Sequence, residues 1–315
     1  MSSCVTATCS ACGFAKAQPY LKGEKHRHRR IQRAYLFFRC AVCLLRFQMI
    51  QSHEAAQLYA ELEDVAPSLQ KPARRPLRCH EDVLRMFRKL GEGRCLLDIG
   101  AGEGEFLAAA SSYGYECLGT DVSASLAKLA AARSGRPVHI GQIVDLDLPP
   151  ASFDWANLDQ VLSYMANPRE AMRKIATLLR PGGMCRVREY NPESLSARLR
   201  GKNYWMYAPT IVNVWTPQAI AAVAASAGLQ LKRVYAGTEA SLTAWLATAN
   251  TKPAWRRLYE PMLFLLRRVR VLGVSLAADT VYYLQKPTDR VASMVSTSAY
   301  QQKKESPASF RSPKV

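Results

Sequence analysis

The sequence of 315 residues lacks an uninterrupted apolar run that is long enough to span a membrane. Its two most apolar stretches, residues 34–50 and 258–283, are broken by arginines, and neither offers the roughly 18 uncharged residues that a spanning helix needs. The first fifteen residues carry no charged side chain, so the basic and then apolar pattern of a secretory leader is also missing. These absences predict a protein without a transmembrane segment, which we expect to be cytoplasmic.

Acidic residues are scarce, because 25 Asp and Glu stand against 43 Lys and Arg and give a formal net charge of +18. The imbalance is uneven: residues 95–168 hold nine acidic and three basic side chains, a net of −6, so the remainder carries +24. Such an excess is compatible with nucleic acid or an anionic membrane surface, and also with arginines on solvated faces. We interpret it as a basic periphery around an acidic ligand site, with an anionic acceptor as one candidate partner.

The chain divides into segments of different composition. Residues 1–50 form a small unit with two cysteine pairs, and residues 51–78 are a proline-containing linker with a short helix at 53–64. Residues 79–287 form the main domain, with a helical insertion at about 236–279. The insertion includes a basic amphipathic helix at 253–270, which would suit peripheral contact with a membrane. Residues 288–315 are rich in Ser, Lys and Gln, and we expect them to be disordered.

Short apolar strands alternate with helical stretches in the main domain. The expected strands are 94–99, 115–120, 138–141, 153–158, 184–189, 229–235 and 280–285, and the expected helices are 105–112, 123–133, 168–179 and 217–227. This alternation is typical of an α/β protein with a doubly wound parallel sheet. The sequence Pro181-Gly182-Gly183 is expected to end the third helix and turn into the next strand.

The most informative motif is the sequence LLDIGAGEG at residues 96–104, where a strand runs into a glycine turn that opens a helix. Glycines allow a tight bend and the close approach of a ligand, and the spacing differs from the G-x-G-x-x-G of dinucleotide enzymes. Asp98, near the strand end, can face an ammonium group, and Asp121, which ends the next strand, can bind two ribose hydroxyls. A ligand with an amino acid at one end and a nucleoside at the other would satisfy both.

Together with the Phe153-Asp154 strand and the LRPGG turn at residues 179–183, these motifs resemble the class I S-adenosylmethionine-dependent methyltransferases over about residues 80–287. The resemblance implies a Rossmann-like, doubly wound, mostly parallel seven-stranded sheet and S-adenosylmethionine as cofactor. It implies cofactor contacts from Asp98, Gly100, Ala101, Gly102, Gly104, Asp121, Val122, Gln142, Ile143 and Asp159. A different nucleotide-binding Rossmann fold, or a site that has lost its function, is the alternative.

The resemblance also assigns roles within this set. Asp121 would hold the ribose, Val122 would pack on the adenine, and Asp159 would face the methionine part. The family usually has an acidic residue at the position of Gln142, whose side-chain carbonyl can still accept a hydrogen bond from the adenine amino group. Ile143 would supply its backbone N–H.

Two Cys-x-x-Cys pairs, Cys9 with Cys12 and Cys40 with Cys43, are separated by 27 residues. Four thiolates at this spacing suit a closed tetrahedral zinc site, and a reducing compartment favours a metal over disulfides. The alternatives are free thiols or a redox pair. The element resembles the zinc ribbon that precedes the methyltransferase domain in a bacterial subgroup, and the resemblance implies a structural zinc that takes no part in the chemistry.

The same subgroup usually carries Leu-Glu-His after the fourth strand, where this chain has Leu162, Ser163 and Tyr164. A second family histidine corresponds to Ile211. With both histidines replaced, a catalytic metal is not expected, and the candidate catalytic residues are Tyr164 and Glu189. Their alternatives are a packing role for Tyr164 and an ion pair with an arginine for Glu189. The aromatic segment 201–209 resembles the family's acceptor-covering segment, or else caps the core.

The resemblance therefore implies an enzyme that methylates an oxygen or a carbon of a small-molecule or glycan-precursor acceptor. Two alternatives stay open. The loss of both histidines would suit a non-catalytic S-adenosylmethionine-binding protein. The cysteine pairs and basic periphery would suit an RNA methyltransferase, but an Asn-Pro-Pro-Tyr-type motif and an aromatic RNA-reading module are missing, so a nucleic-acid partner is not expected.

Overall fold

The computed structural model describes residues 7–23, 34–51, 53–55, 58, 77–237, 270–271, 274–275 and 277–288. Residues 53–55 and 58 are helical, in agreement with the helix expected there. The expected basic helix at 253–270 and the expected disordered tail lie outside the described residues, apart from their end residues 270 and 288.

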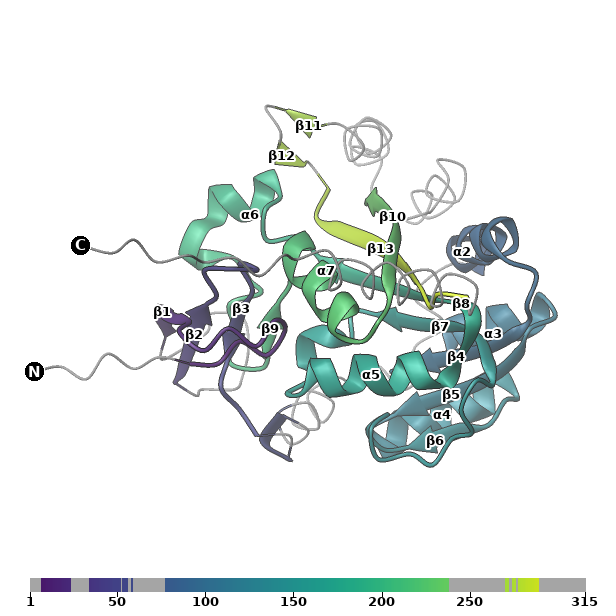
Figure 1. Cartoon of the computed structure of the whole chain (residues 1–315). Helices are drawn as coiled ribbons and strands as arrows, with labels where there is room; N and C mark the ends of the chain where they lie inside the picture. Colours follow the sequence, from purple (N-terminus) through teal and green to yellow (C-terminus); the bar gives the residue numbers. More distant parts are fainter. Residues whose placement is uncertain are drawn as a thin grey trace, which may run out of the picture.

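A seven-stranded sheet forms the centre of the molecule, in the order β10-β13-β8-β7-β4-β5-β6 (Figure 1). The strands from β6 to β8 in that order pair in parallel, and β13 is antiparallel to both β8 and β10. This arrangement confirms the predicted mostly parallel sheet. The bounds are β4 Cys95–Ile99, β5 Glu116–Asp121, β6 Val138–Ile140, β7 Phe153–Asp159, β8 Leu179–Tyr190, β10 Gln230–Ala236 and β13 Asp279–Gln285.

Helices cover both faces of this sheet (Figure 1). Their bounds are α2 Leu77–Leu90, α3 Glu105–Ser112, α4 Ala124–Ser134, α5 Pro168–Leu178, α6 Leu195–Arg200 and α7 Pro217–Ser226. The sequence did not lead us to expect α2, which begins at Leu77 and thus before the predicted domain boundary at residue 79. A second correction concerns α5: it ends at Leu178, and β8 runs through Pro181-Gly182-Gly183 instead of starting after that turn.

The alternation of side chains along the strands divides the core into two layers. Leu96 and Trp155 pack with residues of α2 and α3, whereas Leu97 and Ala156 pack with residues of α5 and α7. In the first layer the Phe87 ring of α2 stacks on Trp155 with centroids 4.1 Å apart. Complete burial of a large apolar side chain such as Phe87 stabilises a fold by about 1.5–3 kcal/mol. Because each face of the sheet buries such side chains, packing stabilises the sheet from both sides.

A second, four-stranded antiparallel sheet has the order β1-β2-β3-β9, with bounds β1 Gln18–Gly23, β2 Tyr35–Arg39, β3 Arg46–Gln48 and β9 Asn213–Val214. Its fourth strand comes from the main domain and lies beside the N-terminal strands at the left of Figure 1. Cys9 and Phe47 also belong to the same apolar core as Leu97 and Trp215. The unit predicted from residues 1–50 is therefore packed into the main domain, with which it shares a sheet and a core.

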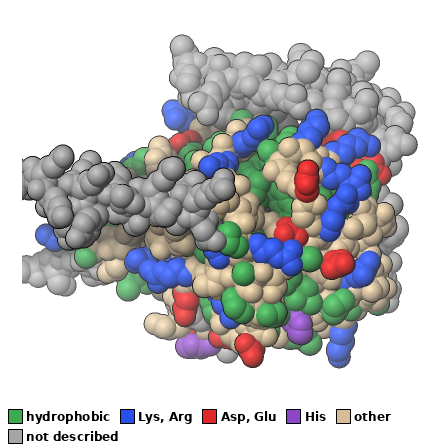
Figure 2. Space-filling model, turned by 45° about the vertical axis from the view of Figure 1, so that its right-hand side comes forward, with side chains coloured by type: hydrophobic (Ala, Val, Ile, Leu, Met, Phe, Trp, Pro, Cys, Tyr) green, Lys and Arg blue, Asp and Glu red, His purple; other side chains and the backbone are tan. Residues whose placement is uncertain are grey.

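The surface carries many of the basic residues, and Figure 2 shows Lys and Arg side chains spread over one face with acidic and hydrophobic side chains between them. Not all of the basic excess is peripheral, however, because Arg186 and Arg188 are 2% and 5% exposed. Within the part of the chain that the structure describes, no helix has both the length and the apolar character that crossing a bilayer requires.

Candidate active site

The glycine turn joins β4 to α3 at the carboxyl end of the central strands. Gly100, Gly102 and Gly104 have positive φ angles of 70°, 55° and 79°, which a residue with a side chain rarely adopts. A Cβ atom at Gly104 would also lie 2.6 Å from the backbone of Ala130. The N–H groups of Gly100 and Ala101 both donate to the Thr120 carbonyl, at 2.8 and 2.9 Å. The turn is thus fixed against the end of β5.

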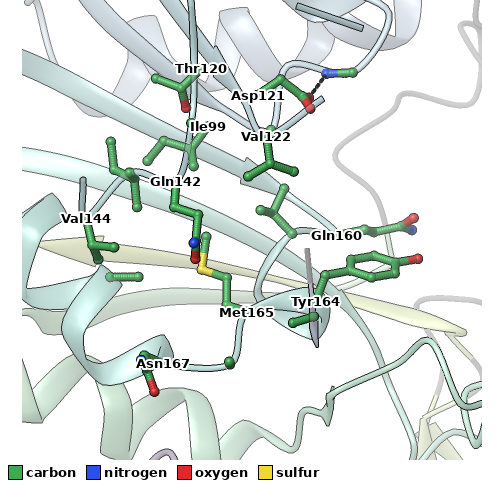
Figure 3. Close-up of a pocket in the computed structure, with 18 of the residues that line it drawn as sticks. Ile99, Thr120, Asp121, Val122, Gln142, Val144, Gln160, Tyr164, Met165 and Asn167 are labelled. Atoms are coloured by element: carbon green, nitrogen blue, oxygen red, sulfur yellow. Dashed lines mark hydrogen bonds between the residues drawn. The ribbon is translucent and has the colours of Figure 1, made fainter. Parts of the chain in front are cut away.

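Asp121, the last residue of β5, lies beside this turn and is 3% exposed. Its Oδ2 accepts a 2.8 Å hydrogen bond from the Gly102 N–H, which Figure 3 shows as a dashed line, and its Oδ1 accepts one of 2.9 Å from the Ser123 N–H. Burial raises the pKa of Asp121, and these N–H groups oppose that change. The carboxylate is therefore held in place at the edge of the turn.

Asp98 lies in β4 and is 2% exposed. Its Oδ1 accepts a 2.7 Å hydrogen bond from Asn157 Nδ2 in the neighbouring strand β7, while its Oδ2 is buried and has no hydrogen-bond partner in the described structure. Burial raises the pKa of Asp98 to about 7, and the bond from Asn157 partly offsets this. A buried carboxylate oxygen without a partner is costly, so this position favours a cationic ligand group.

A cavity of about 310 Å³ opens at the ends of β4, β5 and β7. Binding sites for small molecules typically have volumes of about 300–1,000 Å³. In Figure 3 the side chains of Gln142 and Met165 point into the cavity from opposite sides, and Tyr164 extends along one edge of it. The cavity has the location at which open α/β sheets bind their ligands.

Seven of the ten predicted cofactor residues border this cavity: Gly100, Gly102, Asp121, Val122, Gln142, Ile143 and Asp159. The other three, Asp98, Ala101 and Gly104, do not border it. Sequence reasoning missed several lining residues, among them Gln160, Met165 and Asn167. They belong to no motif, although the positive φ of 61° at Gln160 marks an unusual backbone conformation at the site.

Asp159 ends β7 and is engaged by buried arginines. Arg188 donates from Nε to Asp159 Oδ1 at 2.8 Å, and from Nη1 to Asp279 Oδ2 at 3.0 Å. Arg186 Nη1 lies 3.5 Å from Asp159 Oδ2 and also donates to Asn157 Oδ1 at 2.8 Å. Polar side chains therefore continue from Asp98 through Asn157 into the arginine pair, and Asp159 faces the cavity from a fixed position.

The two candidate catalytic residues lie in different places. Tyr164 ends the short 3₁₀ helix η1 (Leu162–Tyr164) and borders the cavity. Glu189 in β8 does not border it and is 1% exposed. Its carboxylate accepts hydrogen bonds from Ser163 Oγ at 2.6 Å and from the Ser163 N–H at 3.3 Å. Burial raises the pKa of Glu189 to about 8. Its bonds to Ser163 replace the arginine ion pair that we considered from the sequence.

The aromatic segment 201–209 is mostly buried. Tyr204, Met206 and Tyr207 are 2%, 1% and 4% exposed and pack on Phe37 of β2, as a core-capping segment would. Four partly buried aromatic side chains border the same cluster: Tyr35, Tyr164, Tyr190 and Trp205. Tyr190 and Trp205 meet edge to face with centroids 4.4 Å apart. Tyr164 thus connects the cavity to an aromatic surface.

The four predicted metal ligands are close together. The Sγ atoms of Cys9, Cys12, Cys40 and Cys43 all lie within 4.8 Å of one another, and three of the four residues are buried. The Cys43 N–H points to Cys40 Sγ at 3.5 Å, and Gly13 has a φ of 79°, as expected for a knuckle turn. Cys117 and Cys185 are buried in strands and Cys95 is half-buried, and none of the three belongs to this group.

Comparison with known proteins agrees with this geometry. Residues 72–234 match the family described as "Methyltransferase domain". An O-methyltransferase of Aspergillus sclerotiorum, resE, is 32% identical over 133 residues, which cover 36% of this chain and 50% of that protein. A ubiquinone biosynthesis O-methyltransferase of Idiomarina loihiensis is 32% identical over 97 residues, 29% of this chain and 40% of that protein. The chain thus spans about half the length of the relatives it matches, or less.

Solved structures show the same fold. The [4+2]-cyclase SpnF superposes with a TM-score of 0.50 at 20% identity, over 76% of this chain and 97% of that one. A SAM-dependent methyltransferase of Thermotoga maritima gives a TM-score of 0.49 at 20% identity, over 75% of this chain and all of that one.

Proposed function

The chain belongs to the methyltransferase domain family, and on that premise we propose that it transfers a methyl group from S-adenosylmethionine to a small-molecule or glycan-precursor acceptor. The observation that carries the proposal is the position of Asp121, whose carboxylate lies beside the glycine turn at the rim of a cavity of suitable size. Asp98 lies behind the turn, does not border the cavity, and has a buried oxygen without a hydrogen-bond partner in the described structure.

These residues suit the two chemically different ends of the cofactor. The amino-acid end carries an ammonium group, whose charge Asp98 would attract from behind the glycine turn, and Asp121 would accept hydrogen bonds from the ribose hydroxyls. Gln142 and Ile143 would hold the adenine through a side-chain oxygen and a backbone N–H, with Val122 against its face. Ala101 and Gly104 would act through the shape of the turn. When bound, the cofactor supplies an activated methyl group on a sulfonium.

The protein's own contribution is alignment and exclusion of water. Asp159, fixed by Arg188, would keep the methionine end in one orientation, and Met165 would cover the cavity from the side of η1. Tyr164 is the candidate catalytic residue that borders the cavity, so it would orient the acceptor or accept its proton. Glu189 is separated from the cavity by the turn that carries Ser163, and we assign it no contact with the acceptor.

A planar acceptor fits the aromatic surface that continues from Tyr164 to Tyr190 and Trp205, because aromatic faces bind flat apolar groups. The two relatives described above are named O-methyltransferases, which favours a hydroxyl acceptor over a carbon. An anionic acceptor is compatible with the basic surface. No feature of the described cavity favours RNA.

We also propose that the four clustered cysteines bind one structural zinc ion. A closed Cys4 site has no open coordination position for water or substrate, so the metal would stabilise the fold and take no part in the transfer. Four persistent thiolates require a reducing environment, which is why we place the protein in the cytoplasm; cell fractionation would test this.

The function is tested by incubating the purified protein with S-adenosylmethionine and separate panels of phenols, quinols, sugar nucleotides and RNA, and measuring S-adenosylhomocysteine. The proposal expects product that depends on one of the small-molecule panels. Product with RNA alone would replace it by RNA methylation. Binding of the cofactor without product from any panel would indicate a non-catalytic binding protein.

A further inference from the structure

A serine inside the cysteine knuckle contacts the main domain. Ser10 lies between Cys9 and Cys12, and its Oγ donates a 2.9 Å hydrogen bond to Asn213 Oδ1. Asn213 begins β9, and it is completely buried. The bond joins residues 203 positions apart in the sequence, so one side chain bridges the N-terminal sheet and the main domain.

The amide group of Asn213 also bonds the wall of the cofactor cavity. Its Nδ2 donates to the Met165 carbonyl at 2.6 Å and to the Leu162 carbonyl at 3.3 Å. These two carbonyls flank the turn that contains Tyr164. An amide nitrogen has two N–H donors, so Asn213 uses both of them on this turn while its oxygen accepts from Ser10.

The same turn is fixed from two further directions. The Val212 N–H donates to the Ser163 carbonyl at 2.9 Å, and Ser163 itself donates to Glu189. The turn exposes Tyr164 and Met165 to the cavity. Its position therefore depends on β9 on one side and on β8 on the other.

A second hydrogen bond holds the knuckle to the helices of the main domain. Thr216, which caps the N-terminus of α7, donates from Oγ1 to the Cys43 carbonyl at 2.7 Å. Arg169 of α5 also lies close to the knuckle, since a Cβ atom on Gly13 would lie 2.9 Å from its Nη1. The knuckle is thus hydrogen-bonded to the main domain through Ser10 and Thr216, and the bond of Ser10 leads directly to the cavity wall.

We propose that Asn213 is a positioning residue that couples the cysteine knuckle to the cofactor cavity through the turn from Leu162 to Met165. The inference rests on the proposed function, because it takes S-adenosylmethionine as the ligand of the cavity. Since coupling between two sites is reciprocal, the ligand bound in the cavity changes the environment of a metal in the knuckle, and the metal changes the affinity for the ligand.

Two substitutions interrupt the connection at different atoms. Asn213→Asp keeps an oxygen for Ser10 but replaces both donors to the turn by an acceptor that faces two carbonyls. Ser10→Ala removes only the bond to the knuckle. Ser112→Ala is the matched control, because Ser112 is exposed on α3 and its Oγ donates to the Ala108 carbonyl of the same helix. Loss of such buried bonds reduces ligand affinity by about ten-fold.

The experiment replaces the metal of the full-length protein by Co²⁺, whose visible absorption reports the geometry of its thiolate ligands, and titrates S-adenosylhomocysteine. Calorimetry gives the Kd in parallel, and metal analysis and circular dichroism verify that each variant is loaded and folded. We expect the ligand to shift the cobalt spectrum in the wild type and in Ser112→Ala. We expect no shift in Asn213→Asp or Ser10→Ala, together with a Kd about ten-fold higher for Asn213→Asp.

The possible results separate this inference from the proposed function. Ligand binding with an unchanged cobalt spectrum in the wild type would overturn the coupling alone. A spectral shift that persists in both variants would also overturn it. Absence of any binding by the wild type would overturn the proposed function, and the inference with it.

Discussion

Asn157 donates from Nδ2 to Asp98 Oδ1 at 2.7 Å, and the second oxygen of Asp98 lies buried without a hydrogen-bond partner in the described part of the chain. Asn157 of β7 thus orients the carboxylate through one oxygen, while the other oxygen has no hydrogen-bond partner in the described residues. Asp98 does not border the cavity, so an ammonium group bound there would act on it through its charge and favour its ionised form. This relationship makes the binding of a zwitterionic amino acid, as found in S-adenosylmethionine, testable by pH.

The affinity for S-adenosylmethionine is expected to increase from pH 6 to pH 8. The pKa of Asp98 is raised to about 7 by burial, and the ionised carboxylate attracts the cationic ligand through its charge, so protonation weakens binding below pH 7. Asp98→Asn removes this titration. Calorimetry over this pH range should show that the variant binds about ten- to a hundred-fold more weakly and that its Kd does not change with pH as that of the wild type does. The same dependence of Kd on pH in both proteins would rule out Asp98 as its source.

Glu189→Gln is expected to stabilise the protein increasingly as the pH rises. The pKa of Glu189 is raised from 4.5 to about 8 by burial, so between these values the folded state retains a proton that the unfolded chain has released. Stability therefore falls with rising pH across that window, and the penalty is complete above pH 8. The difference in Tm between variant and wild type should grow from pH 5 to pH 9.

The exposed Glu170 provides a control for the chemical change itself, since Glu170→Gln also replaces a carboxylate by an amide, but at the surface of α5. A Tm difference for Glu189→Gln that stays constant with pH would contradict the prediction, because the buried carboxyl of Glu189 would then not titrate in this range.

Arg188→Met is expected to lower the free energy of unfolding by about 3–5 kcal/mol, because it leaves Asp159 and Asp279 without their shared buried cation. Arg180→Met is the matched control, since Arg180 pairs with Asp154 at the surface and surface pairs contribute little. Urea unfolding of both variants checks the prediction. Similar losses in the two variants would contradict a special role for the buried pair.

The parallel sheet could be predicted because its signals are local. The strands β4, β5 and β7 are each a short apolar run followed by a helix, and the glycine turn specifies its own backbone conformation. The same motif places Gly100 and Gly102 at the carboxyl end of β4 and Asp121 at the end of β5. These residues therefore lie together at one edge of the sheet, and their position does not depend on contacts with distant segments.

Other features depend on contacts between distant segments and carry no local signal. The two-residue strand β9 is too short to show a period, and its pairing with β3 is set by tertiary packing. Ser10 stands at a variable position of its Cys-x-x-Cys pair, and its contact with Asn213 exists only in the folded chain. Similarly, the charge of Arg186 and Arg188 suggested surface residues, whereas the carboxylates of Asp159 and Asp279 on neighbouring strands hold them inside the sheet.

Each protein molecule is expected to contain one zinc ion. Cys12→Ser should abolish stoichiometric zinc and lower the Tm, because structural zinc contributes directly to folding stability. Cys95→Ser is the control, since Cys95 is a half-buried cysteine outside the cluster. Metal analysis of the purified proteins and thermal unfolding with and without a chelator check the prediction. Wild-type protein that is free of metal and indifferent to chelator would exclude the zinc site.

The most direct test of the account is a calorimetric titration of the wild type, Asp121→Asn and Asp145→Asn with S-adenosylmethionine. Asp121 lies at the rim of the cavity, whereas Asp145 is exposed and does not border it. We predict one binding site per chain in the wild type, an unchanged Kd in Asp145→Asn, and a Kd at least about ten-fold higher in Asp121→Asn. No binding to the folded wild type at about millimolar ligand, or equal affinity in all three proteins, would contradict the proposed cofactor site.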